Sequence, residues 1–224
     1  VLSASKAWQR KQAKGADIGS VVHDAIEHYV LMNPNVLEPV IDDKTMESVK
    51  DENGEVKMIM PAPGRPSTFD IKEQYLWNIK EAITDVNSPE FVRAMDEFDS
   101  DVECAQKAFD QFKAWWDSVR PALYGAEDLL YSKELNVSGT YDGDIGIPIM
   151  FHPRADLFPD KEFVRCTTDW KTSNASNSKE AAAPEGVYYS YFIQLAIYEL
   201  MRREMRMPPA DDLLAVSARK DGGF

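Results

Sequence analysis

The chain has 224 residues, of which 44% are hydrophobic and 28% are charged. That length is enough for one substantial α/β domain, and the composition is that of an ordinary folded protein rather than a disordered or fibrous one. No stretch approaches the roughly 18 uninterrupted apolar residues that a membrane-spanning helix needs. We therefore expect one folded domain over residues 1–224, without a membrane-spanning part.

The net charge of −13 argues at first sight against a nucleic-acid partner, because binding phosphates requires lysine and arginine. The distribution of charge matters more than the sum, however. A hydrolytic metal site also needs carboxylates, whose charge the bound cations partly cancel. Two basic groups stand out in the acidic chain, near its start and at the end of a late helix: Lys6, Arg10, Lys11 and Lys14, and then Arg202, Arg203 and Arg206.

Apolar residues at helical spacing predict three helices in the first half of the chain. They cover about residues 17–30, 71–86 and 102–119, and the third carries one broad apolar face. Residues 33–68 are rich in Pro, Asp, Glu and Gly and lack this periodicity. We expect a long loop there, with a short hairpin around Asn53-Gly54.

The pattern changes in the second half. Short β-branched or alternating runs at about residues 129–137, 145–157 and 163–170 predict adjacent strands joined by hairpins. A helix over about residues 187–206 and a strand over about 213–218 follow.

This order of elements predicts an α/β fold with a mixed central β-sheet flanked by helices. The helical part covers about residues 1–125, and the sheet with its late helix covers about residues 126–224. The two cysteines, Cys104 and Cys166, are too few for a four-thiolate zinc or iron–sulfur site. We interpret them as buried thiols of a reducing compartment rather than as a disulfide.

The strongest local signal is Thr168-Asp169-Trp170-Lys171-Thr172 at the end of a predicted strand. Because side chains alternate along a strand, Asp169 and Lys171 lie on one face and Trp170 on the other. The carboxylate can hold a hard cation, and the ammonium can orient or deprotonate a water and stabilise charge on a phosphate. As a bare triplet it is more typical of a surface salt bridge, so its interpretation depends on its partners.

A metal site needs a second carboxylate, and two candidates precede the triplet. Asp156 lies thirteen residues before Asp169, and the predicted strand that it closes leads directly into the strand of Asp169. Asp142 lies 27 residues before Asp169, between Gly139 and Gly143, a setting typical of turns. We favour Asp156 and keep Asp142 as the alternative.

Three further elements supply candidate site residues. His23 lies within the first predicted helix, where a neutral imidazole nitrogen could be a third metal ligand. Gln194 and Tyr198 are spaced i, i+4 on the late helix, so they share one face and could grip a phosphate or fix the lysine. Glu134, expected at the centre of a strand, is a further acid that could face the site.

These elements, in this order, resemble the PD-(D/E)XK nuclease superfamily. The resemblance is to its RecB-like branch, and most of all to the RecE-type exonucleases of phages and prophages. It covers about residues 15–205 and is carried by four elements: Gly19-x-x-x-His23, Asp156, Asp169-Trp170-Lys171-Thr172 and Gln194-x-x-x-Tyr198.

The resemblance implies a restriction-endonuclease-like core in which two acids and a histidine bind Mg²⁺ or Mn²⁺ with the help of a main-chain carbonyl. The metal ligands would then be His23, Asp156, Asp169 and the carbonyl of Trp170. Lys171 would be the catalytic lysine beside the two acids, and Gln194 and Tyr198 would contact the substrate. The cysteines that hold the cluster in the CRISPR-associated members have no counterpart here, so no iron–sulfur cluster is expected.

The activity implied is hydrolysis of DNA by a metal-activated water, most readily as an exonuclease of recombination, repair or phage DNA metabolism. The setting implied is the cytoplasm of a bacterial or phage-infected cell. DNA is the expected partner, with a recombination or phage protein or a second copy of the chain as further partners. Two alternatives remain: an endonuclease on the same core, and a nuclease-fold protein that binds DNA or a partner without cleaving.

Overall fold

The computed structural model describes residues 18–33, 38–39, 58–59, 69–173 and 189–219. Within these ranges, the two short strands β1 (Glu38–Pro39) and β2 (Met58–Ile59) pair antiparallel. The expected hairpin turn at Asn53-Gly54 lies outside the described residues.

A four-stranded sheet forms the centre of the described fold. Its strands are β3 (Ala122–Ser132), β4 (Val137–Pro148), β5 (Phe163–Ser173) and β6 (Asp212–Arg219), and they lie in that order across the sheet. β4 runs antiparallel to both of its neighbours, β3 and β5, whereas β6 is parallel to β5. The predicted mixed α/β architecture is therefore confirmed.

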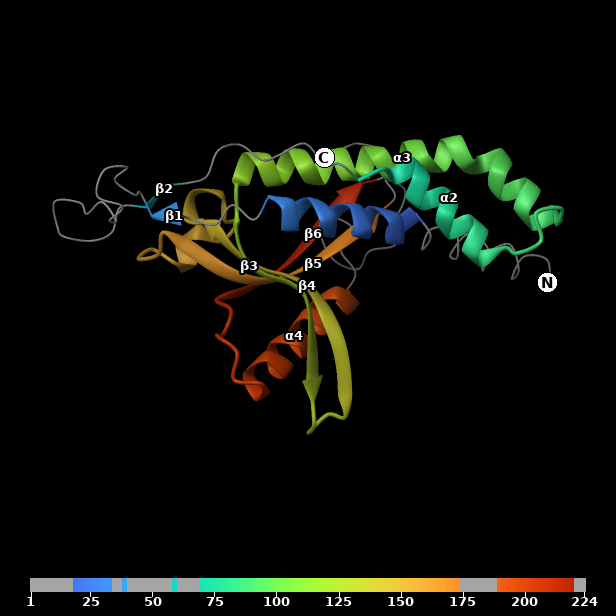
Figure 1. Cartoon of the computed structure of the whole chain (residues 1–224). Helices are drawn as coiled ribbons and strands as arrows, with labels where there is room; N and C mark the ends of the chain where they lie inside the picture. Colours follow the sequence, from blue (N-terminus) through green and yellow to red (C-terminus); the bar gives the residue numbers. More distant parts are fainter. Residues whose placement is uncertain (1–17, 34–37, 40–57, 60–68, 174–188, 220–224) are drawn as a thin grey trace, which may run out of the picture.

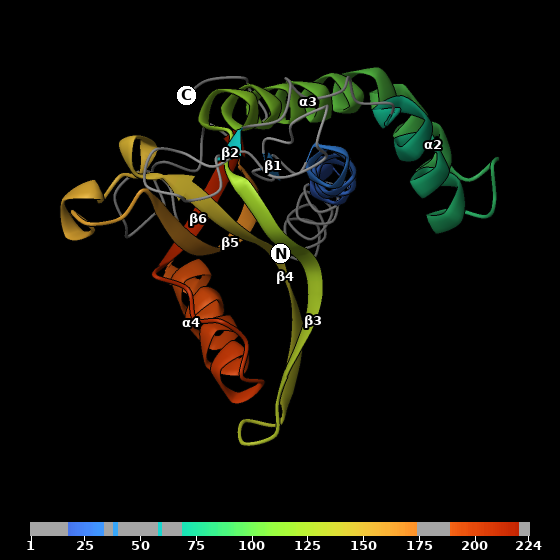
Figure 2. The same ribbon diagram turned by 60° about the vertical axis from the view of Figure 1, so that its left-hand side comes forward.

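Helices cover both faces of this sheet (Figures 1 and 2). The first helix spans residues 18–32 and lies with α3 (Pro89–Val119) on one face. α2 (Ile71–Ala82) packs against α3, and α4 (Tyr189–Glu204) covers the opposite face. None of the described helices is both long and apolar enough to cross a membrane.

α3 is longer than the sequence pattern predicts, since it begins at Pro89 rather than near residue 102. The reason is local, because Ser88 caps the helix by accepting a hydrogen bond from the Phe91 amide at 3.1 Å. Proline at the first helical position has the backbone angle that a helix start requires. The helix ends at Val119 and is capped by Arg120, whose backbone is left-handed with φ 52°.

Two apolar cores lie on the two faces of the sheet. The larger joins the first helix, α2 and α3 to β4, β5 and Ala218 of β6, and the smaller joins α4 to β3 and β4. Trp170 belongs to the larger core, with its ring 5.1 Å from that of Phe112 and 6.4 Å from that of Trp116, both on α3. This packing fixes the orientation of β5 at the position of the Asp-Trp-Lys triplet.

The sheet splits near its middle. Pairing of β4 with β5 ends at Gly143 and Thr168, whereas pairing of β4 with β3 continues to Ser132 and Val137. The outer part of β3 and β4 therefore leaves the sheet as a two-stranded arm, which is visible beside α4 in Figure 1. We call the point where β4 separates from β5 the fork.

The tip of this arm corrects one expectation. Residues 133–136 form its turn, so Glu134 lies exposed at the tip instead of at the centre of a strand. The single strand predicted over residues 129–137 is in fact the end of β3, a turn and the start of β4. β3 itself begins earlier, at Ala122. Glu134 is thereby removed from the candidate site.

Close packing at the fork predicts that Gly143→Ala destabilises the protein. A Cβ atom at this position would lie 2.7 Å from Thr168 Oγ1 and 2.7 Å from an aromatic carbon of Trp170. We expect the free energy of unfolding to fall by about 1–3 kcal/mol in a urea titration, because overpacking a rigid core forces neighbours to shift. Ser138→Ala on the exposed arm is the control, and equal stability of the two variants would contradict this packing.

Candidate metal centre at the fork

His23 of the first helix reaches the backbone of the triplet. Its Nε2 atom lies 2.7 Å from the carbonyl oxygen of Trp170 and 3.4 Å from Asp142 Oδ2. The helix can approach β5 this closely because Gly19, one turn earlier, lies against Thr172, where a Cβ would be 3.1 Å from the hydroxyl. The predicted importance of His23 therefore has a structural basis in the packing of two elements far apart in sequence.

Asp142 occupies the fork itself. Its carboxylate accepts a hydrogen bond of 2.5 Å from the Trp170 amide, a group that the ladder to β4 no longer uses beyond Gly143 and Thr168. The side chain is buried, and only 7% of the residue is exposed. A side-chain carboxylate thus replaces a backbone acceptor, which satisfies the amide and brings an acid against the triplet.

Glu127 of β3 completes this cluster. Its neighbours on both sides pair with the neighbours of Asp142, namely Ala126 with Gly143 and Asp128 with Tyr141, so the two acids stand opposite each other. Glu127 has a left-handed backbone with φ 52°. Ligand atoms of His23, Glu127 and Asp142 all lie within 4.8 Å of one another. Sequence reasoning missed Glu127 because the predicted strand began only at residue 129.

Asp169 and Lys171 lie side by side, as the alternation along β5 predicts. Lys171 Nζ is 2.6 Å from Asp169 Oδ2, and it also lies 5.1 Å from the ring centre of Tyr191 on α4. Asp169 is almost fully buried, and its Oδ2 atom accepts no hydrogen bond of regular geometry from the described residues. A buried carboxylate oxygen held only by a neighbouring ammonium has capacity for a further cation.

The α4 pair approaches the same cluster from the opposite face of the sheet. Gln194 Nε2 donates a 2.6 Å hydrogen bond to the Tyr198 hydroxyl. Burial raises the pKa of Tyr198, the hydrogen bond with Gln194 lowers it, and the negative charges of Asp169, Asp142 and Glu127 raise it further. The expected stacking of Gln194 and Tyr198 on one helix face is confirmed.

The carboxylates at the fork are hard to ionise without a cation. Burial raises the pKa of Asp142 to about 6, with a further rise from Asp169 and an opposing effect of His23. Burial also raises the pKa of Glu127 to about 7, and the negative charges of Asp142 and Glu27 add to this shift. Acids that repel one another in a partly buried cluster are typical of sites whose charge a metal ion compensates.

Asp156, the favoured second acid, lies elsewhere, because the strand expected to carry it ends before reaching it. β4 ends at Pro148, and Asp156 lies exposed on a short 3₁₀ helix, Ala155–Leu157. Neighbouring Arg154 forms an ion pair with Asp212 at the start of β6, which holds this segment at the far end of the sheet.

Asp156 is not among the described residues that could share a metal ion, whereas Asp142 is. Pro148, the last residue of β4, pairs with Phe163 at the start of β5, and the connection that carries Asp156 leaves the sheet there. The alternative acid, Asp142, is the one that the fold brings beside Asp169.

The fork brings together a group that could hold a metal ion, namely His23, Glu127 and Asp142, whose ligand atoms lie within 4.8 Å of one another. His23 Nε2 lies 2.7 Å from the Trp170 carbonyl oxygen and 3.4 Å from Asp142 Oδ2, so imidazole, carbonyl and carboxylate groups meet at this point.

Comparisons of the chain with protein-family models, with curated proteins and with solved structures find no match. The chemistry of the site is therefore inferred from its own residues.

The raised pKa values predict an unusual pH dependence for the metal-free protein. A carboxyl group with a raised folded pKa stabilises the fold below its unfolded pKa, and this contribution is lost as the pH rises through the folded value. Between about pH 5 and about pH 8, the melting temperature of the metal-free protein should fall through the range of about 6 to about 7 set by Asp142 and Glu127. Circular dichroism melts across this range measure the effect.

Asp142→Asn should lose much of this fall, because the amide oxygen still accepts from Trp170 but carries no charge. We expect Mn²⁺ to raise the melting temperature of the wild type at pH 8, and Asp142→Asn should abolish this rise. Asp156→Asn is the matched control and should behave as the wild type in both respects. Identical behaviour of Asp142→Asn and Asp156→Asn would refute the assignment of Asp142.

Proposed function

We propose that the chain is a Mg²⁺- or Mn²⁺-dependent deoxyribonuclease with a PD-(D/E)XK core of the RecB-like kind. The observation that carries the proposal is the convergence of His23 Nε2, the Asp142 carboxylate and the Trp170 carbonyl beside the Asp169–Lys171 pair. A metal-binding group next to a buried acid and an ammonium has the components needed to hydrolyse a phosphodiester.

The proposed assignment differs from the sequence-based one in its acids. Asp142, not Asp156, is the second acid, and Glu127 joins it on the adjacent strand. The other members of the resembling set, His23, Asp169 and Lys171, keep their proposed places. The separation of the two acids is then 27 residues, and the extra length forms the two short 3₁₀ helices between β4 and β5.

The bound metal ion would supply Lewis-acid polarisation of the phosphate and lower the pKa of a coordinated water. His23, Glu127, Asp142, Asp169 and the Trp170 carbonyl would hold this ion. Asp142 and Asp169 are buried, so little water competes with the metal ion for their carboxylates.

Lys171 is proposed to orient the attacking water and to offset charge on the phosphate. Its ammonium is held between the Asp169 carboxylate and the face of Tyr191, and about a fifth of the side chain remains exposed. Those two contacts restrict the long side chain to one region, which reduces the entropy lost when substrate arrives. Gln194 and Tyr198 would hold the phosphate or the lysine from the α4 side.

We propose DNA as the substrate, cut from its ends during recombination, repair or phage DNA metabolism. We expect DNA binding to need a partner protein, because most of the described cations near the sheet are already paired with acids. Examples are Arg165 with Asp144, Arg154 with Asp212 and Lys161 with Asp211. A recombination protein with a basic surface would add the missing positive charge along the DNA.

Labelled linear and circular DNA with Mg²⁺ or Mn²⁺ test the activity and its mode. Degradation of linear DNA alone is the expected result and indicates an exonuclease, whereas cutting of circles indicates an endonuclease on the same core. Absence of cleavage of both forms by the full chain with either metal would overturn the proposed reaction and favour a binding role.

Lys171→Ala should lower the rate of cleavage by about 10²–10⁴-fold, the range of a lost acid–base or orienting group. The rise in melting temperature on adding Mn²⁺ should persist, because Lys171 is no metal ligand in this assignment. Asp156→Ala is the matched control and should cleave normally. Full activity of Lys171→Ala would exclude this mechanism.

A further inference from the structure

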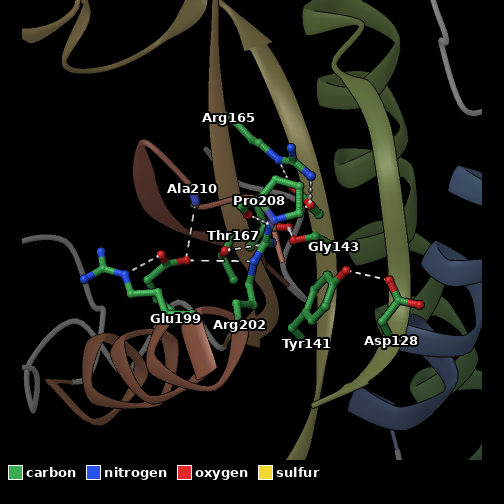
Figure 3. A network of polar contacts seen from close by, with 12 residues as sticks. Asp128, Tyr141, Gly143, Arg165, Thr167, Glu199, Arg202, Pro208 and Ala210 are labelled. Carbon is green, nitrogen blue, oxygen red and sulfur yellow. Dashed lines mark hydrogen bonds and ion pairs between the residues drawn. The ribbon is translucent and has the colours of Figure 1, made fainter. Parts of the chain in front are cut away.

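Arg202 of α4 is a fully buried cation at the centre of the contacts drawn in Figure 3. It donates to Asp144 Oδ2 on β4 at 2.8 Å and to Thr167 Oγ1 on β5 at 3.0 Å. It also donates to the Pro208 carbonyl at 2.7 Å, in the segment that leads to β6. One side chain therefore connects α4 with two adjacent strands and with the approach to a third.

These contacts lie two residues along each strand from the proposed site. Asp144 is two residues beyond Asp142 on β4, and Thr167 is two residues before Asp169 on β5. Asp144 and Thr167 face each other in the ladder, directly beside its last pair, Gly143 and Thr168. Arg202 thus binds to both β4 and β5 immediately before these strands separate at the fork.

The same spacing holds along the helix. Arg202 is four residues, or one turn, after Tyr198, which in turn stands one turn after Gln194. The guanidinium carbon also lies 5.4 Å from the ring centre of Tyr141, the residue next to Asp142. Any shift of Arg202 relative to the ladder is therefore a shift of Tyr198 relative to the two proposed metal-binding acids.

Stability alone does not account for this arrangement. A buried ion pair is often no more stabilising than well-packed apolar residues of similar volume, because removing the charges from water is costly. Moreover, Asp144 already has a cation partner, since Arg165 donates to it through two bonds of 2.9 and 2.6 Å. The second arginine adds a directional connection to α4 that the first does not make.

We propose that Arg202 is a positioning residue that sets α4, and with it Gln194 and Tyr198, against the β4–β5 fork. The proposal rests on the nuclease function proposed above. The planar guanidinium of Arg202 donates in fixed directions to two strands and one loop, which a lysine ammonium cannot reproduce.

Arg202→Lys tests this role, with Arg165→Lys as the matched control. Both variants keep a charge beside Asp144, but only the first loses bonds that α4 makes to Thr167 and to the Pro208 carbonyl. Arg202→Lys should lower kcat on linear DNA by about 10- to 100-fold, the effect of a small misplacement of site groups. Its Mn²⁺ titration, followed by melting temperature, should match the wild type, because the metal ligands lie on other elements. Arg165→Lys should cleave nearly as the wild type does.

A double-mutant cycle separates positioning from a loss of general stability. If Arg202 acts through Tyr198, the loss caused by Arg202→Lys should be much smaller in a Tyr198→Phe background than in the wild type. Equal losses in both backgrounds, or equal losses for Arg202→Lys and Arg165→Lys, would overturn the proposal. Inactivity of the wild type itself would instead overturn the proposed nuclease function.

Thr167→Val covers the case in which Arg202→Lys does not fold. Valine has nearly the shape of threonine but cannot accept the 3.0 Å bond from Arg202. The expected result is a smaller loss of kcat in the same direction, again with an unchanged Mn²⁺ titration. A Thr167→Val protein that folds and retains the wild-type kcat would overturn the proposal.

Discussion

The candidate site depends on the hydrogen bond between the Trp170 amide and the Asp142 carboxylate at the fork. Where β4 leaves β5, a buried amide on β5 loses its backbone partner, and leaving it unsatisfied would be costly. Asp142 supplies the acceptor from its side chain. This hydrogen bond places an acid beside the Trp170 carbonyl and its neighbour Asp169. The contact that satisfies the buried amide therefore also brings together the ligands that the proposed function requires.

The two faces of the sheet contribute different parts of the site. On one face, Trp170 packs against α3 while the first helix brings His23 to the strand end. On the other face, α4 presents Tyr198 to the acids, and Arg202 connects this helix to the ladder below the fork. The imidazole and the phenol thus reach one cluster from opposite sides, across a sheet whose strands are held by two separate cores.

The sequence was most informative where chemistry and periodicity coincide. Alternation placed Asp169 and Lys171 together, and helical spacing placed Gln194 and Tyr198 on one face; the structure shows both. Prediction from the sequence failed where tertiary contacts determine which residues meet. Asp142 has the glycine neighbours of a turn, yet it lies in β4, because Gly143 leaves the space that Trp170 fills. Register across the β3–β4 pair, not any local pattern, brings Glu127 to the site, so no short-range signal could identify it.

A Mn²⁺ soak of crystals of this protein, with diffraction data collected at the manganese absorption edge, would locate the bound ion itself. We expect one anomalous peak at bonding distance, about 2.0–2.4 Å, from the carboxylate of Asp142, with the Trp170 carbonyl and His23 as its neighbours. A peak at Asp156, or manganese bound elsewhere with the fork empty, would contradict it.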